Sequence, residues 1–208
     1  MKGKIADINE LLTSPIEKFG VLLYGPNEYR VNKNYTKIYD ELNKHNDEML
    51  EAQELDANII LNQAETFFNE INTINLGGGI KVVKIDLTDT DKAGCLENYL
   101  ENPTDNSFIV VKSGKLGPKS KLRGLFEKSE SFVVIPFYED TLKDTNIFIE
   151  NYMNSNKLSI THDAKQKIIS FAGQNNKVLE SNLELIFLYM LKNKEKEIDI
   201  DIINKVLF

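Results

Sequence analysis

The feature that most constrains the fold is the segment 21–32, VLLYGPNEYRVN, in which an apolar run leads through a Gly-Pro turn into a polar stretch. A strand that turns at a glycine into the start of a helix is the arrangement of a phosphate-binding loop, whose pattern ends in Gly, Lys and Ser or Thr. Counted from Gly25, those last three positions hold Arg30, Val31 and Asn32. Val31 offers no ammonium to a phosphate, and Arg30 carries a side chain where glycine would let the phosphate approach the backbone. The segment therefore predicts the scaffold of a nucleotide-binding domain with a degenerate phosphate loop.

The same segment also fits a plain connection between a strand and a helix. Pro26 has the backbone angle of a turn residue, and Asn27 can cap the N-terminus of a helix. A working phosphate loop would also need an acidic Mg²⁺ ligand at the end of a later strand. Asp86 follows a predicted strand at 80–85 but has no neighbouring Glu. We therefore expect no catalytic ATP hydrolysis, no cofactor and no metal site in this chain.

Apolar runs of strand length recur up to residue 135 and alternate with segments of helical periodicity. This alternation is typical of an α/β layer with a mainly parallel sheet, and we predict its strands at 20–25, 80–85, 108–111 and 132–135. Beyond residue 140 the periodicity is helical. The clearest apolar stripe, which we expect to be buried in the core, comprises Leu179, Leu183, Ile186, Phe187, Met190 and Leu191. We expect an α/β domain over residues 1–139 and a small all-helical domain over 140–208.

Composition narrows the class of protein. The 208 residues include 25 basic and 32 acidic side chains, for a net charge of -7, which argues against a protein that grips nucleic acid over its whole surface. Cys95 is the single cysteine, so a disulfide framework and a thiolate metal cluster are excluded, and we expect it to be a small core residue. The sequence contains no apolar run long enough to span a membrane, and we expect a cytoplasmic protein.

A local excess of cations stands out against this acidic background. It comprises Lys112, Lys115, Lys119, Lys121 and Arg123, with Lys128 beyond them. Such a run is commonly a solvated loop and helix face. It could also contact DNA phosphates or an acidic neighbouring subunit. Aromatic residues are sparse within it, so we do not expect base stacking or sequence reading.

The segment 74–79, Ile-Asn-Leu-Gly-Gly-Gly, ends a stretch of helical periodicity. A glycine run at this place is commonly no more than the C-terminal cap of the helix. Ile74 and Leu76, however, lie beyond the helical pattern, where apolar side chains have less chance of burial. Exposed apolar residues on a tight turn would form a wedge suited to a hydrophobic pocket on a partner protein.

Four stretches, in this order and spacing, resemble the delta-subunit family of the bacterial DNA polymerase III clamp loader. They are LLYGPNE within 21–28, NLGGGIKVVKI at 75–85, SFIVVKSGKLGPKSKLRGLF within 106–126, and the strand at 131–136. The resemblance extends over nearly the whole chain. It implies an AAA+-type, P-loop NTPase-like α/β domain followed by a helical lid domain, in a subunit that does not hydrolyse ATP itself.

The resemblance also implies a mechanism. In this family a Leu-Phe pair at the turn inserts into a pocket of the sliding clamp and opens one interface of the ring, for loading onto primed DNA. Leu76 falls on the Leu position and Gly77 replaces the Phe, so we expect clamp binding through Leu76 and Ile74. The implied partners are the sliding clamp (the beta subunit), the tau/gamma ATPase subunits and delta-prime, with DNA contacted indirectly or weakly.

Two alternatives stay open. Delta subunits usually continue into a helical collar domain, whereas this sequence ends at Phe208, so either the chain is truncated or the collar is missing. A missing collar would make a free-standing clamp unloader credible. The second alternative is a small P-loop-type NTPase with an atypical phosphate loop, which Mg²⁺-dependent ATP turnover would reveal.

Overall fold

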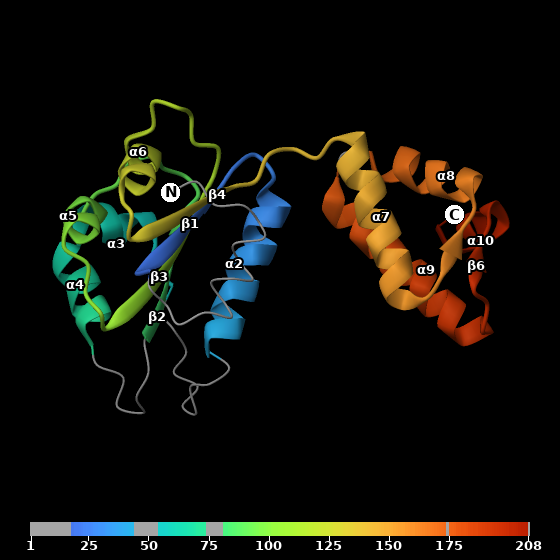
Figure 1. Ribbon diagram of the computed structural model, residues 1–208, viewed down its shortest axis with the longest axis horizontal. Coiled ribbons are helices and arrows are strands. Elements are labelled where there is room, and N and C mark those ends of the chain that lie inside the picture. The colour runs from blue at the N-terminus through green and yellow to red at the C-terminus, as the bar shows by residue number, and fades with distance from the viewer. Residues whose placement is uncertain (1–17, 44–53, 74–80, 174, 208) are drawn as a thin grey trace. The chain divides into compact units, whose positions relative to one another are not determined.

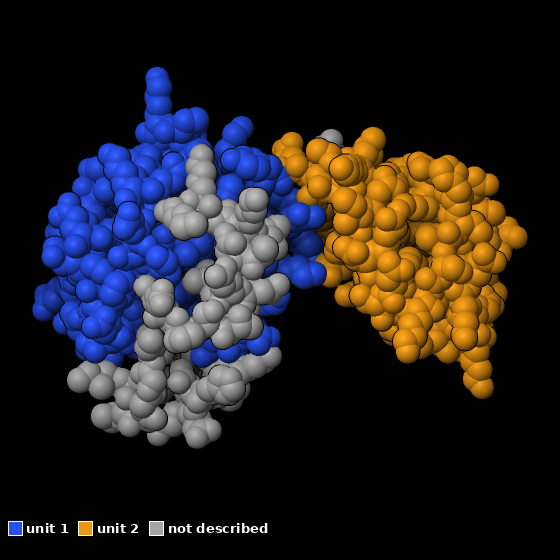
Figure 2. All heavy atoms as spheres, viewed as in Figure 1, with its two compact units in different colours: residues 1–138 blue, residues 139–208 orange. Residues whose placement is uncertain are grey.

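The structure, a computed structural model, describes residues 18–43, 54–73, 81–173 and 175–207. The chain divides into two compact units, residues 1–138 and residues 139–208, which are coloured separately in Figure 2. The described part of the first unit is α/β, and that of the second is mostly helical. None of the helices in these described ranges is long and apolar enough to cross a membrane.

A parallel sheet forms the centre of the first unit. Its strands lie in the spatial order β2-β3-β1-β4, with the bounds β1 Gly20–Tyr24, β2 Lys81–Leu87, β3 Ser107–Ser113 and β4 Phe132–Pro136. Beyond β2, Leu55 adds one isolated parallel bridge to Ile85. Strands β1, β3 and β4 are buried along almost their whole length, because helices cover both faces of the sheet. This burial explains their continuous apolar runs, and it confirms the predicted α/β class with a parallel sheet.

Among the residues that the structure describes, one helix covers one face of the sheet and four shorter helices cover the other (Figure 1). The single helix is α2 (Glu28–Asn43), and its residues Val31, Tyr35 and Ile38 are buried against side chains of β1 and β3. The opposite face is covered by α3 (Ala57–Asn62), α4 (Ala64–Asn72), α5 (Leu96–Glu101) and α6 (Lys121–Lys128).

Aromatic rings form the centre of the core beneath the four short helices. The Phe132 ring lies with its centroid 5.5 Å from that of Phe126 and 6.0 Å from that of Tyr99, in edge-to-face arrangements. Tyr99 in turn contacts Phe67 of α4 at 5.7 Å. One continuous aromatic cluster therefore ties α4, α5 and α6 to β4, which fixes the ends of the loops between them.

The second unit packs its helices around a separate apolar core. The helices are α7 (Leu142–Asn156), α8 (His162–Ala172), α9 (Asn176–Asn193) and α10 (Ile200–Leu207). Helix α7 begins with a capping box, in which Thr141 and Asp144 exchange side chain–backbone hydrogen bonds. Two short strands, β5 (Ser159–Ile160) and β6 (Glu197–Ile198), pair in parallel. The sequence predicted helices alone here, since a two-residue strand is too short to show an alternating pattern.

Candidate vestigial nucleotide site

The turn between β1 and α2 uses its backbone amides within the fold. The Gly25 N–H donates to the carbonyl oxygen of Gly114 at 3.0 Å, and the Asn27 N–H donates to that of Phe137 at 3.2 Å. A phosphate-binding loop works because such amides point outward to the phosphate oxygens. Here those two donors are already paired with carbonyl oxygens, so the turn does not present them to an anion.

The degenerate positions of the loop serve the start of α2. The Asn27 side chain accepts a hydrogen bond from the Arg30 N–H at 3.1 Å, and its carbonyl accepts one from the Val31 N–H at 3.0 Å. Asn27 therefore caps the helix, as its residue type predicted. Val31, at the position of the lysine in the phosphate-loop pattern, is 3% exposed and packs in the core. Pro26 and Arg30 are half-buried, and Asn32 faces solvent.

Lys112, at the carboxyl end of β3, lies among oxygen atoms from three other segments. Its Nζ is 2.9 Å from Oδ2 of Asp86, 3.7 Å from Oε1 of Glu54 and 3.2 Å from Oδ1 of Asn32. The same ammonium lies 4.8 Å from the ring centroid of Tyr35. Its side chain is only 14% exposed. Lys112 is therefore held inside the fold by charge and by cation–π contact.

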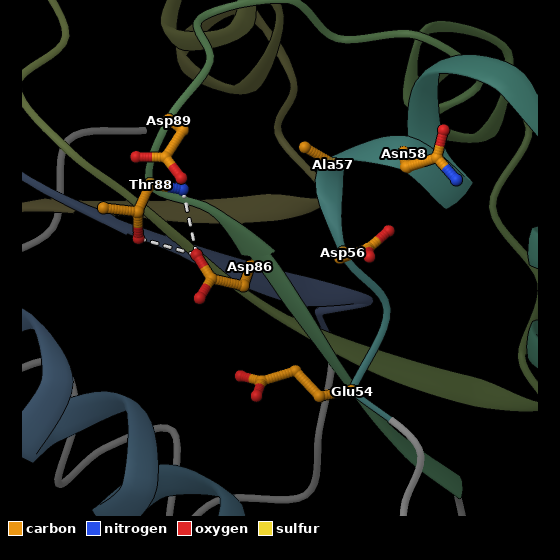
Figure 3. A pocket seen from close by; sticks show the side chains of 7 residues that line it. All are labelled: Glu54, Asp56, Ala57, Asn58, Asp86, Thr88 and Asp89. Atoms are coloured by element: carbon orange, nitrogen blue, oxygen red, sulfur yellow. Dashed lines mark hydrogen bonds between the residues drawn. The ribbon is translucent and has the colours of Figure 1, made fainter.

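Asp86 is kept ionised by its neighbours. Its partial burial opposes ionisation, but hydrogen bonds from Thr88 and Lys112 outweigh that effect and lower the pKa of Asp86 below its ordinary value. Thr88 contributes both its backbone N–H, at 2.9 Å, and its hydroxyl, at 2.6 Å (Figure 3). The carboxylate at the end of β2 is thus fully engaged by groups of its own chain.

A shallow acidic pocket of about 330 Å³ adjoins this cluster. Residues of the segment leading into α3 face residues at the end of β2 across it (Figure 3). Its lining comprises Glu54, Asp56, Ala57, Asn58, Asp86, Thr88 and Asp89. Four carboxylates in one pocket repel the phosphates of a nucleotide. Within the described ranges, no group of three or more His, Cys, Asp or Glu side chains is arranged to hold a metal ion.

Sequence reasoning missed Glu54 and Asp56. Leu55, between them, joins the sheet through a single bridge, and α3 is only six residues long. Neither element is long enough to show a periodic pattern. A usable signal would have been the Asp56 side chain ahead of an apolar run, since Asp56 caps α3 by accepting from the Ile59 N–H at 2.9 Å.

The structure divides the basic run into engaged and exposed members. Lys112 is held as described, and Arg123 pairs with Glu127 at 2.9 Å while lying 5.4 Å from the ring centroid of Tyr24. Lys121, on the outer face of α6, pairs with Glu97 at 2.6 Å. Lys115 and Lys119 are exposed in the loop between β3 and α6. The run is therefore not a uniform basic face.

The predicted clamp-binding residues Ile74, Leu76 and Gly77 lie outside the described residues. The structure does show what precedes and follows them. Helix α4 ends at Asn72, with Phe67 and Ile71 buried in the core. On the other side, Nζ of Lys81, the first residue of β2, lies 2.7 Å from Oε1 of Glu70 and donates to the Glu70 carbonyl at 3.0 Å. Both flanks of segment 74–80 are thus anchored to the core and to each other.

The single cysteine behaves as a core residue. Cys95 is 9% exposed and packs in the cluster beneath the short helices, and its N–H donates to the Ile60 carbonyl at 3.0 Å. Burial raises the pKa of Cys95 to about 11, so the thiol stays protonated at neutral pH. The prediction that it is a buried structural residue is confirmed.

Comparisons with known proteins bear on the whole chain. A sequence profile of the family described as "DNA polymerase III, delta subunit" matches residues 21–135. No curated protein matches the sequence. Among solved structures, the DNA clamp loader delta protein (YqeN) of Bacillus subtilis is similar, with a TM-score of 0.66 and 16% identity. The match covers 97% of this chain and 61% of that one.

A second structural likeness is to the Holliday junction branch migration motor RuvB of Thermotoga maritima. It has a TM-score of 0.52 and 14% identity, and the match covers 98% of this chain and 68% of that one. At such identities the likenesses show the fold, and they confirm the predicted AAA+-like arrangement. The chain spans about three fifths of the length of the Bacillus subtilis protein.

Proposed function

The chain belongs to the family of DNA polymerase III delta subunits, and on that premise we propose that it binds the sliding clamp and opens the ring for loading onto primed DNA. The observation that carries the proposal is the family match over residues 21–135, a range that includes the apolar segment 74–80. The proposed partners are the sliding clamp (beta), the tau/gamma ATPase subunits and delta-prime. The proposed place of action is the cytoplasm.

We propose further that the chain hydrolyses no ATP. Three observations support this: the Gly25 and Asn27 amides are paired with carbonyl oxygens, Val31 is buried, and Asp86 is neutralised by Lys112. Energy for opening the clamp would then come from neighbouring ATPase subunits, which would expose or hide the wedge by moving this subunit. Isothermal titration with ATP and Mg²⁺ separates this proposal from a small P-loop-type NTPase, because binding with turnover would establish the enzyme.

The proposed contact with the clamp is made by Leu76 and Ile74. The anchored flanks favour this role, since a wedge transmits force only when its base is held. The base here is α4 on one side and the Lys81–Glu70 pair on the other. Gly77, in place of an aromatic residue, removes on the order of 1–3 kcal/mol of apolar contact, which Ile74 offsets in part.

A double variant, Ile74→Ala with Leu76→Ala, tests the proposal. We expect its affinity for the sliding clamp, measured by surface plasmon resonance, to fall at least roughly tenfold, since losing two apolar anchors removes more than about 1.4 kcal/mol. The matched control is Leu142→Ala with Ile147→Ala, which truncates two exposed apolar residues of α7 (72% and 44% exposed). A circular dichroism melt checks folding. Equal clamp affinity in the double variant and the wild type would refute the proposal.

Contact with DNA or with an acidic neighbouring subunit remains a proposal for the exposed lysines. Lys115 and Lys119 are free to approach a phosphate backbone, and Lys121 can do so if it leaves Glu97. Lys112 and Arg123 have other roles within the fold. Any contact of this kind would be weak, independent of sequence and sensitive to salt.

A further inference from the structure

The environment of Lys112 is that of a cation bound in a cage. Three oxygens lie around its Nζ at 2.9, 3.2 and 3.7 Å, and they come from β2, from the first turns of α2 and from the segment before α3. Two of them are carboxylate oxygens and the third is an amide oxygen. Hard cations such as Mg²⁺ prefer oxygen ligands of these kinds.

The positions of these ligands in the sequence are informative. Asn32 stands where the phosphate-loop pattern has the Ser or Thr that binds Mg²⁺, and Asp86 is the penultimate residue of β2, near the carboxyl end of a strand, where the acidic ligand of Mg²⁺ is placed. Lys112 Nζ lies between these two residues. A Mg²⁺–nucleotide does not fit beside it, because the ammonium repels the metal and already contacts one oxygen of each ligand.

We propose that the Lys112 ammonium takes the place of the metal ion of a nucleotide site. The ammonium joins α2, β2 and the Glu54 segment permanently, and it excludes divalent cations. The inference rests on the proposed function, since it gives the physical reason why this subunit would work without binding Mg²⁺–ATP. Lys112 thus has two roles: it keeps divalent cations out of the site, and it holds the elements around the site together.

The aromatic side of the cage supports a permanent position for the ammonium. The Tyr35 ring is 2% exposed and lies 4.8 Å from Lys112 Nζ, while Lys84 Nζ lies 4.9 Å from the same centroid. Lys84 is also 5.1 Å from the Tyr39 ring. Cation–π attraction therefore adds to the charge pairing, and the lysine stem is packed rather than solvated.

Two substitutions of Lys112 distinguish the effect of losing its charge from the effect of losing its side-chain volume. Lys112→Ala removes the ammonium and leaves room for a metal ion, whereas Lys112→Met removes the charge but keeps most of the side-chain volume. Lys115→Ala is the matched control, because it removes the same charge from an exposed loop next to β3. Thermal melts in chelator-treated buffer, with and without Mg²⁺, and titration with Mn²⁺ followed by electron paramagnetic resonance are the measurements.

We expect both Lys112 variants to melt roughly 5 °C below the wild type without metal, because one partner of a mostly buried ion pair is lost from a domain of this size. Mg²⁺ should restore part of this loss in Lys112→Ala alone, and this variant alone should gain saturable binding of one Mn²⁺. The Lys115→Ala protein should behave as the wild type. If Lys112→Ala does not fold without metal, purification in Mg²⁺ should recover it.

Three outcomes would overturn the inference. The wild-type chain could itself bind one Mn²⁺ at this cluster. The Lys112→Ala variant could melt at the same temperature as the wild type, or its melting and metal binding could show no response to divalent cations. Neither ATP nor the sliding clamp takes part in these measurements. A failure of the clamp-binding experiment therefore leaves this result intact, and the reverse also holds.

Discussion

The turn after β1 makes a sharp test at Gly25. Its φ is +146°, a region that L-residues rarely enter, and a Cβ added there would lie 2.0 Å from the carbonyl oxygen of Phe137. The same Cβ would lie 2.7 Å from the Phe137 carbonyl carbon and 2.9 Å from its nitrogen. All three are backbone atoms, so no side chain can rotate away to make room. Gly25→Ala must therefore displace the chain at Phe137.

The cost follows from what that displacement breaks. Backbone strain at such a φ costs about 1–3 kcal/mol. The Phe137 N–H donates to Tyr24 at 2.7 Å and its carbonyl accepts from Asn27 at 3.2 Å, and losing both bonds costs about 1–3 kcal/mol. The sum is about 4 kcal/mol, which lowers the melting temperature of a domain of this size by about 10 °C.

Urea unfolding and thermal melts followed by circular dichroism measure this loss. Gly124→Ala is the control, because Gly124 lies inside α6 and a Cβ there meets no atom within 4 Å. The control should be neutral or more stable by up to about 1 kcal/mol, since alanine favours a helix over glycine. If Gly25→Ala were as stable as the wild type, the tight docking of the turn against residue 137, and the reasoning that its amides are unavailable to phosphate, would be wrong.

Two further predictions concern the core and the acidic cluster. Phe132→Ala should destabilise the first unit by about 3–5 kcal/mol in urea, because the ring is fully buried among aromatic neighbours, whereas Leu188→Ala (61% exposed) should cost under about 1 kcal/mol. For Asp86 the folded pKa is lowered, so the unfolded chain binds the proton more readily and the stabilisation by Asp86 is complete above its ordinary pKa of 3.8. The stability difference between wild type and Asp86→Asn should therefore shrink as pH falls below that value through the folded pKa. A difference that does not change with pH would contradict this.

The sheet was predictable because its physics is local and repetitive. Strands buried on both faces must be apolar along their length, and the runs at 20–25, 108–111 and 132–135 showed this directly. Asn27 was predictable as a helix cap for a similar reason, because its chemistry concerns its own backbone neighbours. The apolar stripe on α9 was mostly right, with Leu179, Leu183, Ile186 and Met190 buried. Leu191 was wrong as a core residue, since it lies on the outer side of the last turn and is 60% exposed.

The candidate site was less predictable, because its contacts join segments distant in the sequence. The basic run suggested a surface for DNA, but Lys112 turns inward to Asp86 and Glu54, which lie 26 and 58 positions earlier. No periodicity or motif in a single sequence reports such pairing. The identity of residues 25–32 predicts a degenerate phosphate loop, and this stays a prediction. The hydrogen bonds of its amides to Gly114 and Phe137 could not be predicted, because they join residues that are far apart in the sequence.

Burial of the single thiol, Cys95, has a practical consequence for labelling this protein with fluorophores to measure its motions. Because Cys95 is enclosed and its pKa is about 11, maleimide reagents at neutral pH will react with it slowly. A cysteine introduced at an exposed position such as Ser181 can then carry a fluorophore without first removing the native one. With one such label in each unit, single-molecule energy transfer would report changes in the distance between the two units.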